Sequence, residues 1–515
     1  MNQKLSGLIR SYWILLVIIA IKFILQYIVV NPVYELHRDE FLHLDQAKHL
    51  AFGFISVPPF TSLISKIILL LGGDIFWVRF FPALFGALTI IFVWLIVEAL
   101  GGKLFSKILA SSALLFSLLV RINILFQPNS FDILSWTIIF FLLIKFVQSE
   151  KSKWLFLLSV IIALGLYNKY NLAFLIIGLL ASLLLTSQRK IFSNISFWKA
   201  VLIAAILFLP NIIWQVVNHF PIVEHMKVLK ATQLDNNSAS GFMKSQLLYF
   251  FGSLPLTIGA LIAFILFKPF KKFRFVGLTF ALVMALFTVL KAKDYYAIGL
   301  FPVLFAFGSV YFESILSGYR KPVIVTILIC FNLFISVSTA KLVLPILSPS
   351  EIRKNSQAFE KMGLLRWEDG KNHSLPQDFA DMIGWREMAD ISLKAYKMIP
   401  ANELESTMIF CDNYGQTGAL NYYNRGKMPE AYSFATDYIY WLPRMKKIQN
   451  ILIVGDRPDK RVTDLFTGVQ LVGTVENEYA REKGTGIYLM TGANELVTAM
   501  FYKLADDRKK NFDIF

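Results

Sequence analysis

Cysteine, histidine and, over two thirds of the chain, acidic residues are all scarce in this sequence. The 515 residues include two cysteines and six histidines. Cys330 lies in an apolar run and Cys411 in a predicted strand, so we expect no disulfide between them. His37, His43 and His49 follow one another at intervals of six residues, a spacing that puts no two of them on one helix face. No zinc-type spacing is present, so we predict no metal cofactor, and no divalent cation is indicated.

Two common catalytic signatures are also missing. The glycine pairs Gly72-Gly73 and Gly101-Gly102 are predicted turns, and neither resembles a phosphate-binding glycine loop. No serine nucleophile elbow is visible. These absences argue against a nucleotide-binding loop and against a hydrolase of the serine-elbow type.

Acidic residues are unevenly distributed. Residues 1–344 carry 29 Lys/Arg and 12 Asp/Glu, whereas residues 345–515 carry 22 and 23. A nucleic-acid-binding surface needs its basic excess on the soluble part, which here is neutral, so nucleic acid is not a predicted partner. The positive-inside rule instead assigns the basic excess to cytoplasmic loops of a membrane protein.

Long apolar runs dominate the first two thirds of the chain. The sequence is 56% hydrophobic and has a mean hydropathy of +0.57, which indicates a mainly α, polytopic membrane protein. With a basic loop after every second span, we predict eleven transmembrane helices. They lie near residues 11–30, 79–98, 105–122, 131–147, 154–167, 171–187, 198–217, 246–267, 275–291, 296–314 and 322–342.

This topology places the loop at residues 31–78 and everything after residue 345 on the outer, extracytoplasmic face. In the loop we predict two interfacial amphipathic helices, at about 40–51 and 59–71, the second opened by Pro58 and Pro59. We therefore divide the chain into a membrane domain, residues 1–344, and a soluble domain, residues 345–515. The latter combines a helix near 377–398 with β-branched or aromatic runs and is predicted to be a small α/β domain. Those runs lie at 407–411, 431–434, 451–454 and 487–490.

The densest acidic cluster of the membrane part lies in the first outer loop. Charged groups beside a membrane span are costly and usually functional, so we predict the active site here. The cluster consists of Glu35, Asp39, Glu40 and Asp45, with His37, Arg38 and His43 beside them.

Acids elsewhere in the membrane part have less specific explanations. Glu313 lies at a predicted cytoplasmic helix end, where a solvated charge is expected. Asp132 lies just inside an apolar run, at its outer end. It either faces a polar cavity or stabilises the first turn of its helix through the helix dipole.

Several lysines and arginines lie on the predicted outer side, where the positive-inside rule disfavours them. Cations at membrane depth can bind the phosphate group of a lipid carrier. If they face an acid, that acid can accept the proton of an acceptor hydroxyl while the cations stabilise the departing phosphate. These cations are Arg38, Arg79, Arg121, Lys169, Lys227, Lys230, Lys291 and Lys293.

A set of motifs, modest singly but specific together, resembles the bacterial family 39-like glycosyltransferases. This membrane group is akin to dolichyl-phosphate-mannose protein mannosyltransferases and to the lipid A aminoarabinose transferase, and it has the GT-C architecture. The motifs are HRDEFLHLDQAKHLAFGF, RFFPALFGALT, FQPNSFDILSW, GLYNKYNLAFL, LPNIIWQVVNHFPIVEHMKVLKATQL, KAKDYYAIGLFPVLFAFG, DMIGWREM and DNYGQTGALNYYNRGKMPEAYSF.

The resemblance implies an inverting transfer of a sugar from a polyprenyl phosphate to a hydroxyl of a glycolipid, glycan or protein. It implies a bacterial inner-membrane protein with its tail outside. Asp39 maps onto the family's base, with Glu40 beside it, and Asp132 onto its second acid. Val57 stands where many relatives carry a polar residue. The implied donor-phosphate contacts are Lys169, Lys291, Lys293, Tyr295 and Arg79, and the residues expected around the pocket are Arg38, His43, Pro58, Pro59 and His225.

Two other function classes remain as alternatives. A transporter or flippase of a lipid-linked sugar predicts helices broken near the bilayer middle and repeat symmetry. The sequence has one proline-containing helix, around Pro210, and no internal repeat. A membrane-anchored binding protein would work through its tail, which leaves the acids of the first outer loop unexplained.

Overall fold

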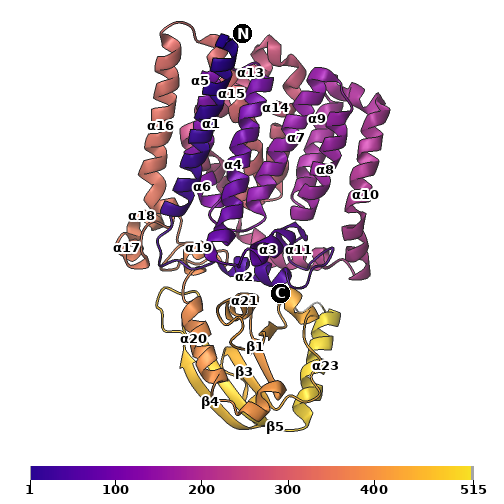
Figure 1. The fold of residues 1–515 in the computed structure, drawn as a ribbon, viewed down its shortest axis with the longest axis vertical. Coiled ribbons are helices and arrows are strands. Elements are labelled where there is room, and N and C mark those ends of the chain that lie inside the picture. The colour runs from indigo at the N-terminus through magenta and orange to yellow at the C-terminus, as the bar shows by residue number, and fades with distance from the viewer. Residues whose placement is uncertain (1, 512–515) are drawn as a thin grey trace. The chain divides into compact units, whose positions relative to one another are not determined.

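The computed structural model describes residues 2–511, which form two compact units (Figure 1). The first contains the chain up to Val30, residues 76–214 and residues 233–346. The second contains residues 31–75, 215–232 and 347–515. The first outer loop therefore groups with the tail, although the domain boundary that we predict at residue 345 counts it with the membrane part.

The first unit is built of helices. Where the apolar runs are uninterrupted the helices are long, and Gly, Pro and basic residues separate them. The helices are α1 (Asn2–Ile28), α4 (Ile75–Ala99), α5 (Leu104–Leu115), α6 (Leu119–Ile122), α7 (Asn129–Ser149), α8 (Lys153–Asn168), α9 (Leu172–Leu184), α10 (Ile195–Val217), α12 (Ala239–Tyr249), α13 (Leu254–Leu266), α14 (Arg274–Val289), α15 (Phe301–Ile315) and α16 (Arg320–Val343). Short 3-10 segments are η1 (Ser187–Ser193), η2 (Leu234–Asn236), η3 (Phe251–Ser253), η4 (Lys268–Phe273) and η5 (Asp294–Leu300).

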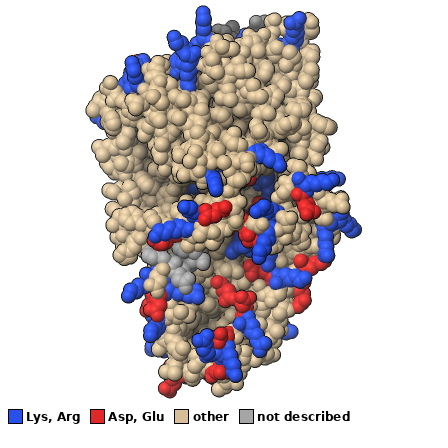
Figure 2. All heavy atoms as spheres, turned by 180° about the vertical axis from the view of Figure 1, so that it is seen from behind, with Lys and Arg blue, Asp and Glu red and all other residues tan. Residues whose placement is uncertain are grey.

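Six of these helices are long and apolar enough to cross a membrane, or up to eight if each of two bent helix pairs is one span, within the described part of the chain. The remaining three predicted spans coincide with shorter apolar helices in α1, α5 and α8. Every predicted span thus falls on a helix, and the chain is a multi-pass membrane protein. The count of eleven is not confirmed. On the face seen in Figure 2, Lys and Arg gather at one end of the helix bundle, next to a broad uncharged surface.

Close helix packing holds the first unit together. α7 packs against α8, and α13 against α15. A Cβ at Gly308 of α15 would overlap the carbonyl of Leu256 on α13, so glycine is required for this approach.

Glu313 is buried and accepts hydrogen bonds from the Lys103 backbone N–H and the Ser106 hydroxyl, both at 2.6 Å. It satisfies the first turn of α5, so the prediction of a solvated Glu313 was wrong.

The second unit contains a five-stranded sheet of order β2-β1-β3-β5-β4. β2, β1 and β3 run parallel, with Ile409 opposite Leu452, and β5 runs antiparallel to β3 and to the edge strand β4. The strands are β1 (Thr407–Cys411), β2 (Tyr432–Ser433), β3 (Asn450–Gly455), β4 (Phe466–Thr474) and β5 (Gly486–Ala493). All four predicted strands are present, and the small α/β region in the tail is confirmed. β4 has no counterpart in the sequence-based prediction.

Helices surround this sheet, and several come from outside the tail. α20 packs against β3, β4 and β5, and α2 packs against α21. The helices are α2 (Arg38–Gln46), α3 (Phe60–Leu70), α11 (Pro221–Thr232), α17 (Pro349–Lys354), α18 (Ser356–Lys361), α19 (Gln377–Ala380), α20 (Trp385–Tyr396), α21 (Tyr414–Tyr423), α22 (Lys460–Thr463) and α23 (Leu496–Asn511), with η6 (Ala401–Ser406) and η7 (Thr436–Tyr440). Both helices predicted in the first outer loop are present, as α2 and α3.

One carboxylate ties the first outer loop to α20. Glu35 accepts hydrogen bonds from the backbone N–H groups of Gly384 and Arg386, at 3.2 and 2.9 Å, and from the Tyr423 hydroxyl at 2.9 Å. An anion at a helix N-terminus is favourable. Gly384 has φ +88°, which glycine adopts without strain, and it separates α19 from α20. The single helix predicted at 377–398 is therefore interrupted here.

Candidate active site

The acidic motif of the first outer loop forms the start of α2. His37 is the N-cap residue, and its Nδ1 accepts a hydrogen bond from the backbone N–H of Asp39 at 3.2 Å. Glu40 completes a capping box, because its Oε2 accepts from the His37 backbone N–H at 2.7 Å. Glu40 is 1% exposed. Of the two adjacent acids, Glu40 is therefore engaged by the backbone, which leaves Asp39 as the carboxylate with access to solvent.

Asp39 is held from two sides. Its Oδ1 accepts a hydrogen bond from the Tyr414 hydroxyl at 2.8 Å, and its Oδ2 lies 3.7 Å from Nδ1 of His37. The Arg38 guanidinium lies over the Tyr414 ring, 4.3 Å from its centre. Although 35% of the Asp39 side chain is exposed, the network orients the carboxylate.

Electrostatics keep Asp39 ionised. Partial burial opposes the charge, but His37 and Arg38, with smaller effects from His43 and Tyr414, outweigh it and lower the pKa of Asp39 to about 2. The carboxylate is thus a permanent anion near neutral pH. It can accept a hydrogen bond from a hydroxyl group, but it holds a proton only weakly.

A second layer of charge lies behind this carboxylate. Nε2 of His37 is 3.6 Å from Oδ2 of Asp381 and 4.0 Å from Oδ1 of Asp378. Arg481 pairs with Asp381 at 3.0 Å. Burial raises the pKa of Asp381, against the opposing charges of His37, Arg481 and Arg38. We did not single out Tyr414 or Asp381 from the sequence, although both belong to motifs that carry the family resemblance.

The other residues predicted to lie near the reacting groups are in the same unit as Asp39. His43 is buried, its Nδ1 lies 3.1 Å from Oε1 of Gln46, and burial lowers its pKa despite the charge of Asp39. Pro59 is the N-cap residue of α3, directly after Pro58, and its carbonyl accepts from the Ser62 hydroxyl at 2.7 Å. His225 lies on α11.

Asp132 is the centre of a separate polar cluster in the first unit. It is 5% exposed in the first turn of α7. Oδ1 accepts from the Trp136 indole N–H at 2.9 Å, and Oδ2 accepts from the Asn171 amide at 3.0 Å. The N-cap of α7 is Pro128. Both carboxylate oxygens bind side chains, so Asp132 is part of an interior polar network, and its place in the first turn of α7 is also one where the helix dipole favours an acid.

Lys169 joins this cluster from the break between α8 and α9. Its Nζ donates to Oδ1 of Asn129 at 2.7 Å and lies 4.8 and 4.5 Å from the ring centres of Tyr295 and Tyr296. The Asn171 amide that binds Asp132 also donates to the Tyr296 carbonyl at 3.1 Å. The fold thus brings together predicted site residues that are far apart in sequence. Asp132 and Lys169 lie in one cluster with the two tyrosines of η5.

The other three cations predicted to bind the donor phosphate are Lys291, Lys293 and Arg79. Lys293 is the residue before η5 and acts electrostatically on Lys169. Lys291 has a left-handed backbone, φ +48°, and its carbonyl accepts from the Asn237 amide at 3.3 Å. Arg79 lies on α4, near Tyr27 of α1. The structure gives none of these three a hydrogen bond to Asp132 among the described residues.

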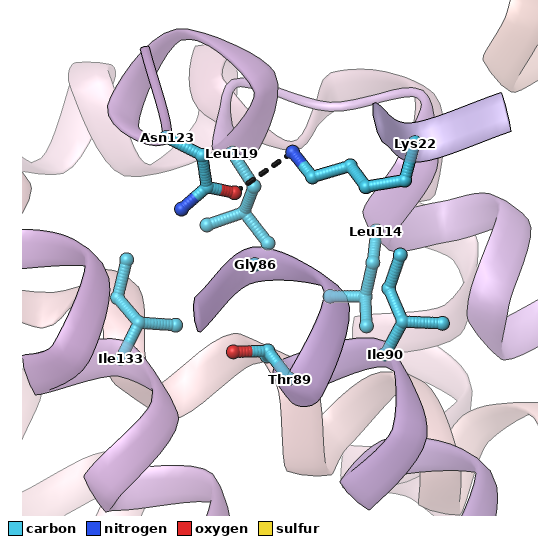
Figure 3. Close-up of a pocket in the computed structure, with 8 residues that line it drawn as sticks. All are labelled: Lys22, Gly86, Thr89, Ile90, Leu114, Leu119, Asn123 and Ile133. Atoms are coloured by element: carbon cyan, nitrogen blue, oxygen red, sulfur yellow. Dashed lines mark hydrogen bonds between the residues drawn. The ribbon is translucent and has the colours of Figure 1, made fainter. Parts of the chain in front are cut away.

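Sequence reasoning overlooked a buried lysine in the first helix. Lys22 is 2% exposed, and its ammonium donates to Oδ1 of Asn123 at 2.8 Å (Figure 3). Asn123 in turn donates to the Ser130 hydroxyl at 3.0 Å, in the first turn of α7. A cavity of about 10 Å³, room for about one water molecule, lies beside this contact. A lysine inside an apolar run is the signal that could have found it.

No group of three or more His, Cys, Asp and Glu side chains within residues 2–511 has the arrangement of a metal site. Among the acids around Asp39, Asp381 pairs with Arg481 at 3.0 Å, and His37 lies within 4.0 Å of Asp39, Asp378 and Asp381.

Comparison with known proteins places this arrangement in context. The family model described as dolichyl-phosphate-mannose-protein mannosyltransferase matches residues 56–214. A comparison with curated proteins gives no match. The crystal structure of ArnT from Cupriavidus metallidurans bound to undecaprenyl phosphate is similar to this chain, with a TM-score of 0.61 and 12% identity over 93% of this chain and 98% of that one. The chain has the GT-C fold.

A second GT-C structure agrees. Archaeal oligosaccharyltransferase AglB from Archaeoglobus fulgidus, in complex with an inhibitory peptide and a dolichol-phosphate, matches with a TM-score of 0.50 and 10% identity, over 86% of this chain and 70% of that one. The apo ArnT structure matches as the bound one does, with a TM-score of 0.61. The GT-C fold that the sequence motifs imply is therefore confirmed.

Proposed function

We propose that this chain is an inverting membrane glycosyltransferase. It transfers a hexose or pentose from a polyprenyl phosphate to a hydroxyl of a glycolipid, glycan or protein. Residues 1–344 form the membrane catalytic domain, in a bacterial inner membrane, and residues 345–515 form an extracytoplasmic domain. In the reaction the bond between the anomeric carbon and the phosphate oxygen breaks, and a bond from the acceptor oxygen forms on the opposite face. The acceptor loses its hydroxyl proton.

The observation that carries this proposal is the oriented, ionised carboxylate of Asp39. Its Oδ1 is fixed by Tyr414 at 2.8 Å, while 35% of the side chain remains accessible to a hydroxyl group. A carboxylate that is always charged can accept the acceptor's hydroxyl hydrogen at every turnover. Arg38 and His43 line the neighbourhood of this carboxylate.

The donor phosphate is assigned to the cluster around Lys169. An ammonium group flanked by two tyrosine rings, 4.8 and 4.5 Å away, can bind an anion and stabilise the negative charge of a departing phosphate. ArnT and AglB were solved with undecaprenyl phosphate and dolichol-phosphate, which supports a lipid phosphate as the ligand here. Lys291, Lys293 and Arg79 are further candidate contacts, and Asp132 orients Asn171 beside Lys169.

Mass spectrometry of the cell envelope tests the function. A strain lacking the gene is complemented with wild-type protein, Asp39→Asn or Asp390→Asn, each expressed at matched level. Asp390 is an exposed acid on α20, so its substitution makes the same charge change away from the site. We expect one class of envelope glycolipid or glycoprotein to lose a single sugar in the deletion strain and with Asp39→Asn, and to regain it with the other two.

Two outcomes contradict the proposal. If Asp39→Asn restores the sugar fully, Asp39 is not the base. If the deletion strain lacks the sugar and accumulates sugar-charged polyprenyl phosphate on the cytoplasmic side, while the purified protein transfers no sugar from that donor, the protein is a flippase.

A further inference from the structure

His37 lies between two sets of carboxylates. His37 is 3% exposed, with Nδ1 3.7 Å from Oδ2 of Asp39. On the other side, Nε2 has no hydrogen-bond partner among the described residues and lies between Asp381, at 3.6 Å, and Asp378, at 4.0 Å. Helix capping requires only one ring nitrogen, so the cap leaves this second half of the imidazole unexplained.

The cap defines the resting tautomer. Nδ1 accepts the backbone N–H of Asp39 at 3.2 Å, so the ring proton of a neutral imidazole is on Nε2 and points toward Asp381 and Asp378. Protonation at Nδ1 exchanges that backbone contact for one with Oδ2 of Asp39. The resulting imidazolium lies between anions on both sides, where its charge is favourable.

We propose that His37 takes over the proton that Asp39 removes from the acceptor hydroxyl. The step rests on the proposed transfer reaction. The proton moves from the acceptor oxygen to Asp39 and from there to Nδ1 of His37. His37 then releases a proton to water, with Asp378, whose side chain is 52% exposed, as the acid nearest to solvent. Per turnover one proton leaves the acceptor and one enters the solvent. Loss of the Nε2 proton leaves the ring protonated at Nδ1, and exchange of that proton with solvent for one at Nε2 restores the resting tautomer.

The weak basicity of Asp39 explains why a second proton acceptor is needed. A carboxylate is a weak proton acceptor near neutral pH, so a proton left on Asp39 returns readily to the alkoxide of the acceptor. An imidazole has an ordinary pKa near 6.5 and retains a proton far better. The charged or titratable groups around His37 are Arg38, Asp39, Glu40 and His43 from its own segment, and Asp378, Asp381 and Arg481 from the elements packed against it.

His37→Asn separates this role from helix capping. Asparagine is a good N-cap residue, so the start of α2 is retained while the titratable ring is removed. Full-length protein in nanodiscs is supplied with undecaprenyl-phosphate hexoses or pentoses and envelope extract as acceptor, and release of undecaprenyl phosphate is followed from pH 4.5 to 8.5. The matched control is His373→Asn, since His373 stacks on Trp367 elsewhere in the second unit.

The wild-type kcat should fall as the pH is lowered, because a His37 ring that is already protonated cannot accept the proton from Asp39. His37→Asn should lower the plateau of kcat by about 10²-fold and abolish this acidic limb, with unchanged binding of undecaprenyl phosphate. His373→Asn should behave as wild type. If His37→Asn keeps the limb, or keeps kcat within a factor of two, the proposal is overturned, and water takes the proton from Asp39 directly.

A second variant at a half-exposed residue, Asp378, tests the same proposal in case His37→Asn fails to fold. Asp378→Asn removes one negative charge 4.0 Å from Nε2, which makes the protonated ring less favourable, so the acidic limb should move to lower pH. A limb that stays in place overturns the proposal. Asp39→Asn is assayed in parallel: if it is inactive while His37→Asn resembles wild type, the transferase function stands and only the proton transfer fails. If Asp39→Asn is active, the proposed function itself fails.

Discussion

The hydroxyl of Tyr414 donates a hydrogen bond to Oδ1 of Asp39 across 2.8 Å, between residues 375 positions apart in the sequence. Asp39 lies in the first turn of α2, and Tyr414 opens α21. These two helices pack against each other. A residue of the tail therefore orients the carboxylate that we assign as the base, which gives the tail a direct part in the site.

Tyr414→Phe should weaken that orientation without removing the ring. The variant loses one hydrogen bond to a charged group, which costs about 1.5–3 kcal/mol in the free energy of unfolding, and the pKa of Asp39 rises toward its ordinary value. We expect kcat to fall about tenfold, since a loosely held carboxylate is misaligned. Tyr422→Phe, whose ring packs on Phe41 with centres 5.5 Å apart, is the control. Equal kcat values for the two variants would contradict this role.

Lys169→Gln should weaken binding of the lipid phosphate. The ammonium supplies a charge-assisted contact with a phosphate, and glutamine does not, so we expect the Kd for undecaprenyl phosphate to rise about tenfold or more. Lys271→Gln makes the same change at an exposed position of η4 and should leave the Kd unaltered. Binding is measured by microscale thermophoresis in nanodiscs. An unchanged Kd for Lys169→Gln would assign the phosphate to other cations.

Asp437 should make the protein less stable as the pH rises. It is buried and accepts hydrogen bonds from the Ile55 backbone N–H, the Gln46 amide and the Ser56 hydroxyl, at 2.7, 2.8 and 3.3 Å. Burial outweighs these bonds and raises its pKa to about 6. A raised carboxyl pKa gives stability that is complete below the unfolded pKa, near 4, and is lost as the pH rises through about 6.

The loss should amount to about 3 kcal/mol between pH 4 and 7. Asp437→Asn cannot ionise, so its melting temperature should fall less over this range than that of the wild type. The exposed Asp390→Asn variant should keep the wild-type slope. Parallel pH profiles for wild type and Asp437→Asn, measured by differential scanning fluorimetry in detergent, would show that Asp437 stays ionised in the folded protein.

Lys22 and Asn123 should be energetically coupled. Lys22→Met leaves the Asn123 and Gln26 oxygens without their buried donor, and the resulting loss should be about 1–3 kcal/mol in the free energy of unfolding. Asn123→Leu alone should leave the buried ammonium short of one acceptor. The double variant should be less destabilised than the sum of the two, by at least about 0.5 kcal/mol. Strict additivity in a double-mutant cycle would show that the contact contributes nothing.

Much of the fold could be predicted from the sequence. Apolar length locates a membrane helix without tertiary information, so each predicted span falls on a helix, and β1 (Thr407–Cys411) has the bounds predicted. β4 was missed because its residues, Phe466–Thr474, include two glycines and a solvent-exposed middle. Its pairing with β5 holds it in the sheet. The break at Gly384 depends on a positive φ that helix propensity does not report.

The site could be predicted only in part. Asp39 and Asp132 stood out because acids are rare in the membrane part of the chain. Tyr414, Asp381 and Arg481 did not, since polar side chains are common in a soluble tail and their importance arises only from long-range packing. The burial of Lys22 equally depends on Asn123, about a hundred residues away. Glu313 was misjudged for the same reason, because its backbone partner at Lys103 is remote in sequence.

The central claim is tested most directly by one measurement on purified, nanodisc-reconstituted protein. Release of undecaprenyl phosphate from undecaprenyl-phosphate-linked sugars, with envelope extract as acceptor, is compared between Asp39→Asn and Asp390→Asn. We expect Asp39→Asn to lose at least about 10²-fold in kcat while binding undecaprenyl phosphate normally, and Asp390→Asn to match the wild type. Equal turnover by Asp39→Asn and the wild type would contradict the account.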